Sequence, residues 1–265
     1  MNNVLLYTSF LIFVYVNILF VYSLVHKRND VADIGWGIGF LIIALASLNF
    51  DYHFRGALDI RSVIFTALVA IWSIRLSSHI WIRNRKKSED WRYNQWREEW
   101  GKLFYVRSYL QVYILQGIFM LLVSLPVMYG ITTHYPIFPT VFDVLGILVF
   151  IIGFLYETVS DAQLARFLKN PDNKGKLMTS GLWRFSRHPN YFGEITLWWG
   201  IFLITLNTPA IIFTFVGPLC ITLLITKVSG VPLLEKKFES HPDWEGYKKN
   251  VSKLIPLHPG KKIIG

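Results

Sequence analysis

The stretch Gly181-Leu-Trp-Arg-Phe-Ser-Arg-His-Pro-Asn-Tyr-Phe-Gly-Glu194 joins a polar segment, residues 170–176, to an apolar segment, residues 195–206. Its arginines, histidine, asparagine and glutamate therefore stand at the edge of a hydrophobic span. Pro189 lacks an N–H group and has a fixed φ, so it fits the first turn of a helix. We predict that a membrane helix begins here, with polar groups gathered at its N-terminus.

This helix would carry Asn190, Glu194 and Trp198 on one face, because they are four residues apart. Arginines beside a helix N-terminus suit an anionic group such as phosphate. An acid one turn into a membrane helix is costly unless it has a partner or a task. The alternative is a basic interfacial loop whose Arg and Lys side chains contact lipid phosphates.

The composition indicates a membrane protein. Of the 265 residues, 53% are hydrophobic and only 17% are charged, and the mean hydropathy is +0.39. Such a chain is too apolar for a soluble globular domain. The net charge of +10 is explained by cytoplasmic loops that face anionic lipid, so nucleic acid is not expected as a partner. The single cysteine, Cys220, cannot form an internal disulfide.

We predict an all-α polytopic membrane protein that forms one integral membrane domain, residues 1–265. About seven apolar stretches have the length needed to cross ~30 Å of hydrocarbon. Most of the 27 Lys and Arg residues fall on one side of these stretches, which places the N-terminus outside and the C-terminus inside. The predicted spans are residues 4–25, 34–50, 60–82, 108–130, 141–160, 191–206 and 210–229.

Two acids at the inner end of the fifth span share a helix face, because Glu157 and Asp161 are four residues apart. They would either pair with Arg184 or Arg187, or hold the hydroxyl and amide groups of a nucleotide. Beyond them, a short interfacial helix is expected to carry Gln163 and the basic residues that follow.

Several motifs are absent from the sequence. The run Gly35-Trp-Gly-Ile-Gly39 has the wrong spacing for a dinucleotide fingerprint, and it indicates a close helix-packing face instead. There is no His-Glu-x-x-His motif and no other metal-ligand spacing, so we predict no metal site.

The central stretch, with Trp198-Trp-Gly200 after it, resembles the steroid 5-alpha-reductase-like family, in particular a bacterial branch of unknown function. The resemblance also includes segments elsewhere in the chain: Asp33-Ile-Gly-Trp-Gly37, Trp72-Ser-Ile-Arg75, Glu89-Asp-Trp-Arg-Tyr93, Gln116, Asp161-Ala-Gln163 and Gly175-Lys176. The Arg-His-Pro-Asn-Tyr core is shared with isoprenylcysteine and phospholipid methyltransferases, which bind S-adenosylmethionine. The tail, Leu234-Glu-Lys-Lys-Phe with Tyr247, is similar to both groups.

The reductase resemblance implies a seven-helix enzyme that uses NADPH to reduce a carbon–carbon double bond conjugated to a carbonyl in a lipophilic, steroid- or isoprenoid-like substrate. By matching position, it implies that the cofactor-binding residues are Asp161, Gln163, Lys169, Lys176, Arg184, Arg187, His188, Asn190, Tyr191, Glu194 and Tyr247. Steroid-reducing members use an acid in the second span and a later tyrosine to polarise the ketone. This chain has no Glu in that span, so Asp33 and Tyr93 are its nearest candidates for the catalytic residues.

In that reaction negative charge develops on the carbonyl oxygen, so a hydrogen-bond or proton donor is needed there. Tyr93 could donate, oriented by Asp33 or Asp90. A lipophilic substrate could enter from the bilayer, which we expect to be a bacterial inner membrane, or the endoplasmic reticulum membrane in a eukaryote. Two alternatives stay open: an S-adenosylmethionine-dependent methyltransferase, and a non-enzymatic lipid-binding protein.

Overall fold

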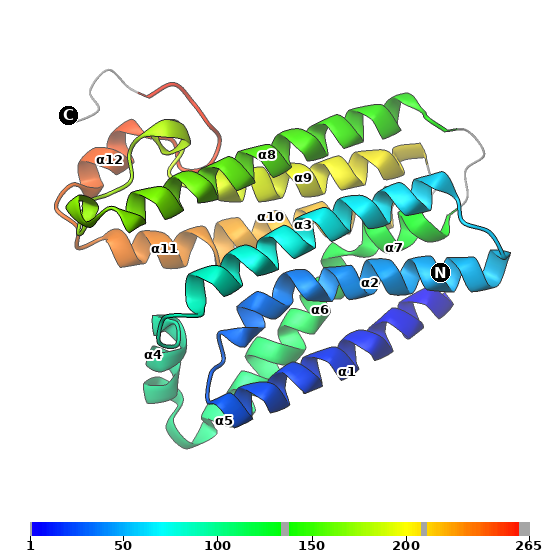
Figure 1. Ribbon diagram of the computed structural model, residues 1–265, viewed down its shortest axis with the longest axis horizontal. Coiled ribbons are helices and arrows are strands. Elements are labelled where there is room, and N and C mark those ends of the chain that lie inside the picture. Colours follow the sequence, from blue (N-terminus) through cyan, green and yellow to red (C-terminus); the bar gives the residue numbers. More distant parts are fainter. Residues whose placement is uncertain (1, 134–137, 208–210, 260–265) are drawn as a thin grey trace. The chain divides into compact units, whose positions relative to one another are not determined.

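The structure, a computed structural model, describes residues 2–133, 138–207 and 211–259. Throughout these ranges the regular structure is helical, and extended pairing is limited to an isolated bridge between Ser186 and Ser252 (Figure 1). Six helical stretches are long and apolar enough to cross a membrane. The predicted all-α polytopic fold is therefore confirmed, while the number of crossings and their orientation stay predictions.

The described chain forms two compact units. The first comprises residues 1–138 and 207–217, and the second comprises residues 139–206 and 218–265. The chain passes between the units three times, at residues 138/139, at residues 206/207, and inside helix α10 (Ile211–Leu223) between Gly217 and Pro218.

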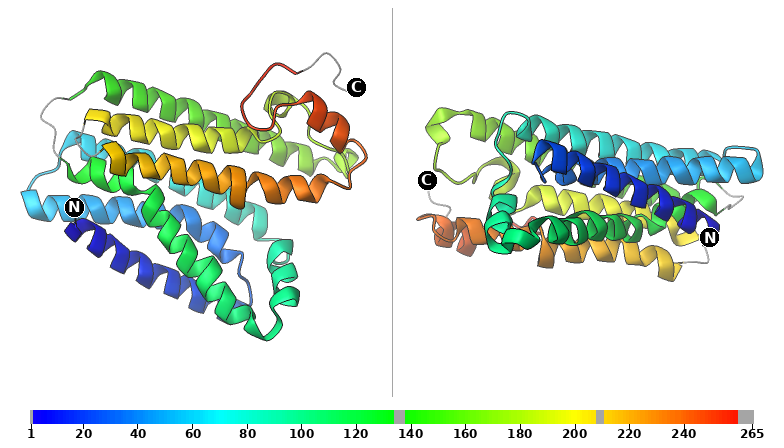
Figure 2. Two further views of the ribbon diagram at one scale, coloured as in Figure 1. Left: turned by 180° about the vertical axis from the view of Figure 1, so that it is seen from behind. Right: turned by 90° about the horizontal axis from the view of Figure 1, so that it is seen from below.

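The first unit begins with three long helices, α1 (Asn2–His26), α2 (Val31–Arg55) and α3 (Ile60–Asn84), which run side by side (Figures 1 and 2). Helix α2 extends beyond the predicted end at residue 50. Arg55 pairs with Asp51 at 2.7 Å, one turn earlier, and donates to the carbonyl oxygen of Thr132 at 2.9 Å. These contacts keep a charged turn helical until Gly56, whose positive φ of 73° ends the helix.

The predicted span 108–130 consists of three pieces, and two short helices precede it. Two helices, α4 (Trp91–Trp100) and α5 (Phe104–Arg107), are joined by the short turn η1 (Gly101–Leu103). The wider, π-helical segment η2 (Ser108–Ile114) continues into α6 (Leu115–Val123), and α7 (Leu125–Thr132) follows. The break at Ser124 has a local cause, because Pro126 lies in the first turn of α7 and has no N–H group to continue the α6 ladder.

The second unit is built on α8 (Val141–Lys169) and α9 (Pro189–Ile204), which pack closely against each other. Two glycines on each helix, seven residues apart, allow the two helices to approach so closely. A Cβ atom on Gly146 or Gly153 would collide with the α9 backbone, and one on Gly193 or Gly200 would collide with the α8 backbone. The two helices therefore touch backbone to backbone, the packing mode of small residues in membranes.

Helix α8 continues to Lys169 without a break, so the prediction of a separate interfacial helix after Ser160 is wrong. Its start is fixed by a capping box between Thr140 and Asp143. Helix α9 has only 16 residues and covers the predicted span 191–206 as far as Ile204. Whether α9 crosses the membrane stays a prediction.

The remaining elements are short. They are the turns η3 (Pro171–Asn173), η4 (Gly181–Arg184) and η5 (Thr205–Asn207), the π-helical segment η6 (Leu224–Val228), and the helices α11 (Val231–Phe238) and α12 (Trp244–Asn250). Helices α10 and η6 together occupy the predicted seventh span, residues 210–229. Trp244, Tyr247 and Val251 form a small buried cluster in the second unit.

Candidate functional site

The N-terminus of α9 begins where the sequence predicted it. His188 precedes the helix and Pro189 lies in its first turn. His188 is only 3% exposed, and its ring stacks on that of Tyr191, with centroids 5.7 Å apart and an interplanar angle of 18°. The polar residues directly before this apolar helix, Ser186, Arg187 and His188, are thus buried in the second unit.

Arg187 is tied to the C-terminal part of the chain. Its Nε and Nη2 groups donate to Oε1 of Glu235 at 2.9 and 2.7 Å. Its Nη1 group donates to the carbonyl oxygens of Lys248 and Val251. The guanidinium is 7% exposed, so its donors are largely used within the protein.

The ion pair of Arg187 with Glu235 replaces the pairing with Glu157 or Asp161 that the sequence suggested. These contacts give Arg187 a structural task, and its contact with a cofactor stays a prediction. Glu235 belongs to the tail motif Leu234-Glu-Lys-Lys-Phe but was not predicted as a site residue, because it lies 47 positions after His188 in the sequence. The sequence feature that could have identified Glu235 is its place as an acidic residue in the tail, directly before Lys236 and Lys237.

His188 is a neutral imidazole at pH 7. Burial lowers the pKa of His188 to about 4, although its hydrogen bond to Glu235 acts in the opposite direction. Nε2 lies 3.3 Å from Oε1 of Glu235. Nδ1 is buried and has no hydrogen-bond partner among the described residues.

Asn190 and Asp161 connect α9 to α8. The Nδ2 group of Asn190 donates to Oδ1 of Asp161 at 3.1 Å, and Asp161 is 7% exposed. The Oδ1 atom of Asn190 is buried and, within the described part of the chain, accepts no hydrogen bond. Glu157 precedes Asp161 by one turn of α8, Glu194 follows Asn190 by one turn of α9, and both are buried. Two of the predicted cofactor residues, Asp161 and Asn190, are therefore in contact at the N-terminal end of α9.

Two other predicted cofactor residues, Gln163 and Tyr247, bind the turn η4, which precedes α9. Oε1 of Gln163 accepts from the backbone N–H of Leu182 at 2.9 Å, and a Cβ atom on Gly181 would collide with the Gln163 side chain. The Tyr247 hydroxyl donates to the carbonyl oxygen of Trp183 at 2.6 Å, and burial raises the pKa of Tyr247. By contrast, three basic side chains are exposed: Lys169, Lys176 and Arg184.

The predicted catalytic pair is in contact within the first unit. The Tyr93 hydroxyl donates to Oδ1 of Asp33 at 2.9 Å, and Tyr93 is 2% exposed. Arg92 donates to Oδ2 of Asp33 at 2.6 Å and to Oδ1 of Asp90 at 2.9 Å. A tyrosine hydroxyl has one hydrogen, and here it points to the Asp33 carboxyl group, whose other oxygen accepts from Arg92. Asp90 contacts Arg92 and caps α4, whereas Asp33 orients Tyr93.

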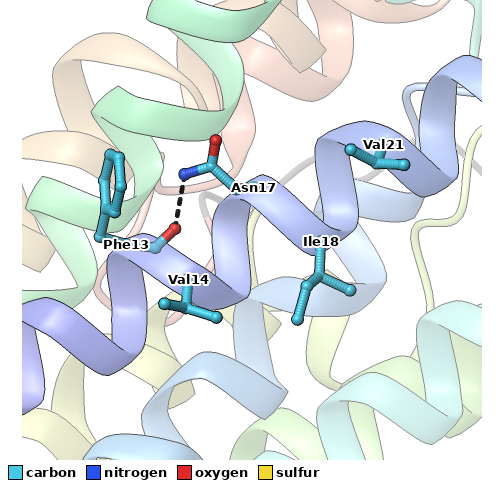
Figure 3. Close-up of a pocket in the computed structure, with 5 residues that line it drawn as sticks. All are labelled: Phe13, Val14, Asn17, Ile18 and Val21. Carbon is cyan, nitrogen blue, oxygen red and sulfur yellow. Dashed lines mark hydrogen bonds between the residues drawn. The ribbon is translucent and has the colours of Figure 1, made fainter.

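A shallow hollow on α1 offers no comparable chemistry. It is lined by Phe13, Val14, Asn17, Ile18 and Val21 (Figure 3). Its polar side chain, Asn17, donates to the Phe13 carbonyl oxygen at 2.7 Å and accepts from the Tyr109 hydroxyl at 3.2 Å. The hollow has no titratable lining residue, so it is not the candidate site. In residues 2–133, 138–207 and 211–259, no cluster of three or more His, Cys, Asp and Glu side chains could hold a metal ion.

Comparisons with known proteins extend these observations. A stretch of 53 residues is 43% identical to a protein named probable O-methyltransferase ustE, from Ustilaginoidea virens. The match covers 20% of this chain and 18% of that protein. No solved structure matches the chain. Residues 19–251 match the family described as protein of unknown function (DUF1295), which is steroid 5-alpha-reductase-like. Because this match covers most of the sequence, the chain belongs to that family.

Proposed function

We propose that this protein is an NADPH-dependent membrane reductase of a carbon–carbon double bond conjugated to a carbonyl in a lipophilic substrate. The observation that carries the proposal is the group of buried acceptors at the N-terminus of α9. Nδ1 of His188 and Oδ1 of Asn190 are acceptors without partners in the described structure, and the Asp161 carboxylate lies beside Asn190. Buried polar atoms are normally satisfied, so these atoms fit a ligand that brings several N–H and O–H groups.

A dinucleotide fits both sets of residues, the buried acceptors and the exposed basic side chains nearby in the sequence. Its ribose hydroxyls and carboxamide are donors for His188, Asn190 and Asp161. Its phosphates suit the exposed basic residues Lys169, Lys176 and Arg184. When bound, NADPH would supply the hydride, and the protein would supply position and a dry environment.

We assign proton donation to Tyr93, with Asp33 as the group that orients it. The Tyr93 hydrogen points to Asp33, so it must turn toward the substrate oxygen before it can serve there. Protonation of Asp33 would release the Tyr93 hydrogen, because a neutral carboxyl group can donate its own hydrogen to the phenol oxygen in return. Arg92 opposes this change by stabilising the Asp33 anion.

The second candidate is an S-adenosylmethionine-dependent methyltransferase. The similarity to a protein named probable O-methyltransferase favours it, and the buried acceptors would also fit the amino and hydroxyl groups of that cofactor. The exposed basic residues favour the phosphate-bearing cofactor. For either reaction we propose a bacterial inner membrane as the location, or the endoplasmic reticulum membrane in a eukaryote.

The test is thermal unfolding of the detergent-solubilised protein with NADPH or with S-adenosylmethionine. We expect NADPH to raise the melting temperature in proportion to the logarithm of its concentration above Kd. Tyr93→Phe should keep that stabilisation but lose reductase activity with a lipid-soluble enone. Stabilisation by S-adenosylmethionine alone would favour the methyltransferase, and stabilisation by neither would favour a lipid-binding protein.

A further inference from the structure

The Glu235 carboxylate links three cationic or titratable side chains of the second unit. Its Oε1 accepts from Arg187 at 2.9 and 2.7 Å and lies 3.3 Å from Nε2 of His188. Its Oε2 lies 4.0 Å from Nζ of Lys253. Arg187 and His188 are almost fully buried, while Lys253 is exposed. The carboxylate thus already has a permanent cation, Arg187, and this guanidinium would repel a positive charge on His188.

This geometry selects one form of the His188 ring. A carboxylate can only accept, so Nε2 must carry the hydrogen that faces Glu235. A neutral imidazole has one N–H group, so Nδ1 then carries a lone pair. The opposite tautomer would point a lone pair at the carboxylate and leave a buried N–H at Nδ1 without an acceptor. Both effects are unfavourable.

We propose that Glu235 is a positioning residue that holds His188 in the Nε2–H tautomer, so that Nδ1 accepts a hydrogen bond from an N–H or O–H group of the bound cofactor. This inference rests on the proposed function for the nature of the ligand. The tautomer of the free protein does not depend on that function. The two parts can therefore fail separately.

The first measurement is nitrogen NMR of the full-length protein in lipid nanodiscs, with ¹⁵N-labelled histidine. His188→Gln identifies the His188 signals by their loss. We expect the neutral Nε2–H pattern in wild type at pH 7. An Nδ1–H pattern or a charged ring would overturn the role of Glu235, and this result needs no variant of Glu235 that folds.

The second measurement uses Glu235→Asp, which keeps a charge for Arg187 but withdraws the carboxylate from His188 by one methylene. We expect the Nδ1–H tautomer of His188 to become populated. The NADPH affinity should fall about five- to tenfold, the scale of one hydrogen bond. The matched control is Lys253→Met, which removes the charge beside Oε2 and leaves His188 in place. It should match wild type in both measurements, and equal losses in the two variants would overturn the proposal.

The third measurement follows the Nδ1 resonance of His188 when NADPH is added to wild type. A hydrogen bond to the lone pair should shift this resonance, and an unchanged resonance under saturating NADPH would overturn the ligand contact. If NADPH does not bind wild type at all, the proposed function fails together with this contact. In that case the His188 tautomer of the free protein still decides whether Glu235 positions the ring.

Discussion

Glu194 lies one turn beyond Asn190 on α9 and is only 9% exposed. If it serves the cofactor, Glu194→Gln should weaken NADPH binding by about 1–3 kcal/mol, because a charge-assisted hydrogen bond is lost. The protein should still fold and insert. Calorimetry on the folded protein gives the affinity, and melting without NADPH gives the stability. Lowered stability with unchanged affinity would make Glu194 a structural residue.

Arg187 is expected to act mainly on stability. Arg187→Ala removes the donors to Glu235 and to two backbone carbonyls. Breaking a buried ion pair leaves an uncompensated charge and costs about 3–5 kcal/mol. Chemical unfolding in detergent without NADPH should show this loss. An unchanged unfolding free energy, with weakened NADPH binding, would instead assign Arg187 to the cofactor.

His188 should make stability depend on pH. Its folded pKa of about 4 lies below the ordinary value of 6.5. As the pH falls from about 6.5 to about 4, the unfolded chain binds a proton that the folded protein excludes, so the unfolding free energy falls. Above pH 6.5 this contribution is fully retained. His188→Gln should flatten the pH dependence in this window, and parallel wild-type and variant curves would contradict the neutral buried ring.

At the scale of the element, the α8–α9 pair depends on four glycines. Gly153→Ala places a methyl group against the backbone at Gly193 and Leu197, so the helices must separate. We expect a loss of about 1–3 kcal/mol, the usual effect of overpacking, measured as the unfolding free energy in detergent.

The control for this prediction is Gly117→Ala in α6. There the atoms nearest to the new methyl group belong to the side chains of Ile12 and Val16, at 3.2–3.3 Å, and a side chain can shift more easily than backbone. A loss for Gly117→Ala as large as that for Gly153→Ala would show that close backbone packing is not what makes Gly153 necessary.

At the scale of the whole molecule, the asymmetry of Lys and Arg predicts that the C-terminus lies in the cytoplasm. A reporter fused after Gly265 should be active only if it is a cytoplasmic type. A paired fusion with a reporter that works only outside the cytoplasm should be silent, and activity of that second fusion would refute the predicted orientation.

The sequence by itself determined the membrane class, the all-helical fold and the start of α9. These follow from apolar length and from the missing N–H of Pro189, which are properties of a few consecutive residues. Through the family resemblance it also predicted Asp161 and Asn190 as cofactor residues, and their contact with each other was seen only in the structure. Helix ends were harder to predict, because contacts such as Asp51–Arg55 extended a helix past its apolar stretch.

Only the tertiary structure showed that Arg187 is bound to Glu235, that Gln163 and Tyr247 hold the preceding loop, and that His188 keeps a buried acceptor. In the sequence, Arg187 and Lys176 are both basic residues near a helix N-terminus. Folding buries Arg187 and leaves Lys176 exposed. The physical reason is that the cost of burying a charge depends on partners far away in the chain, which a local pattern does not contain.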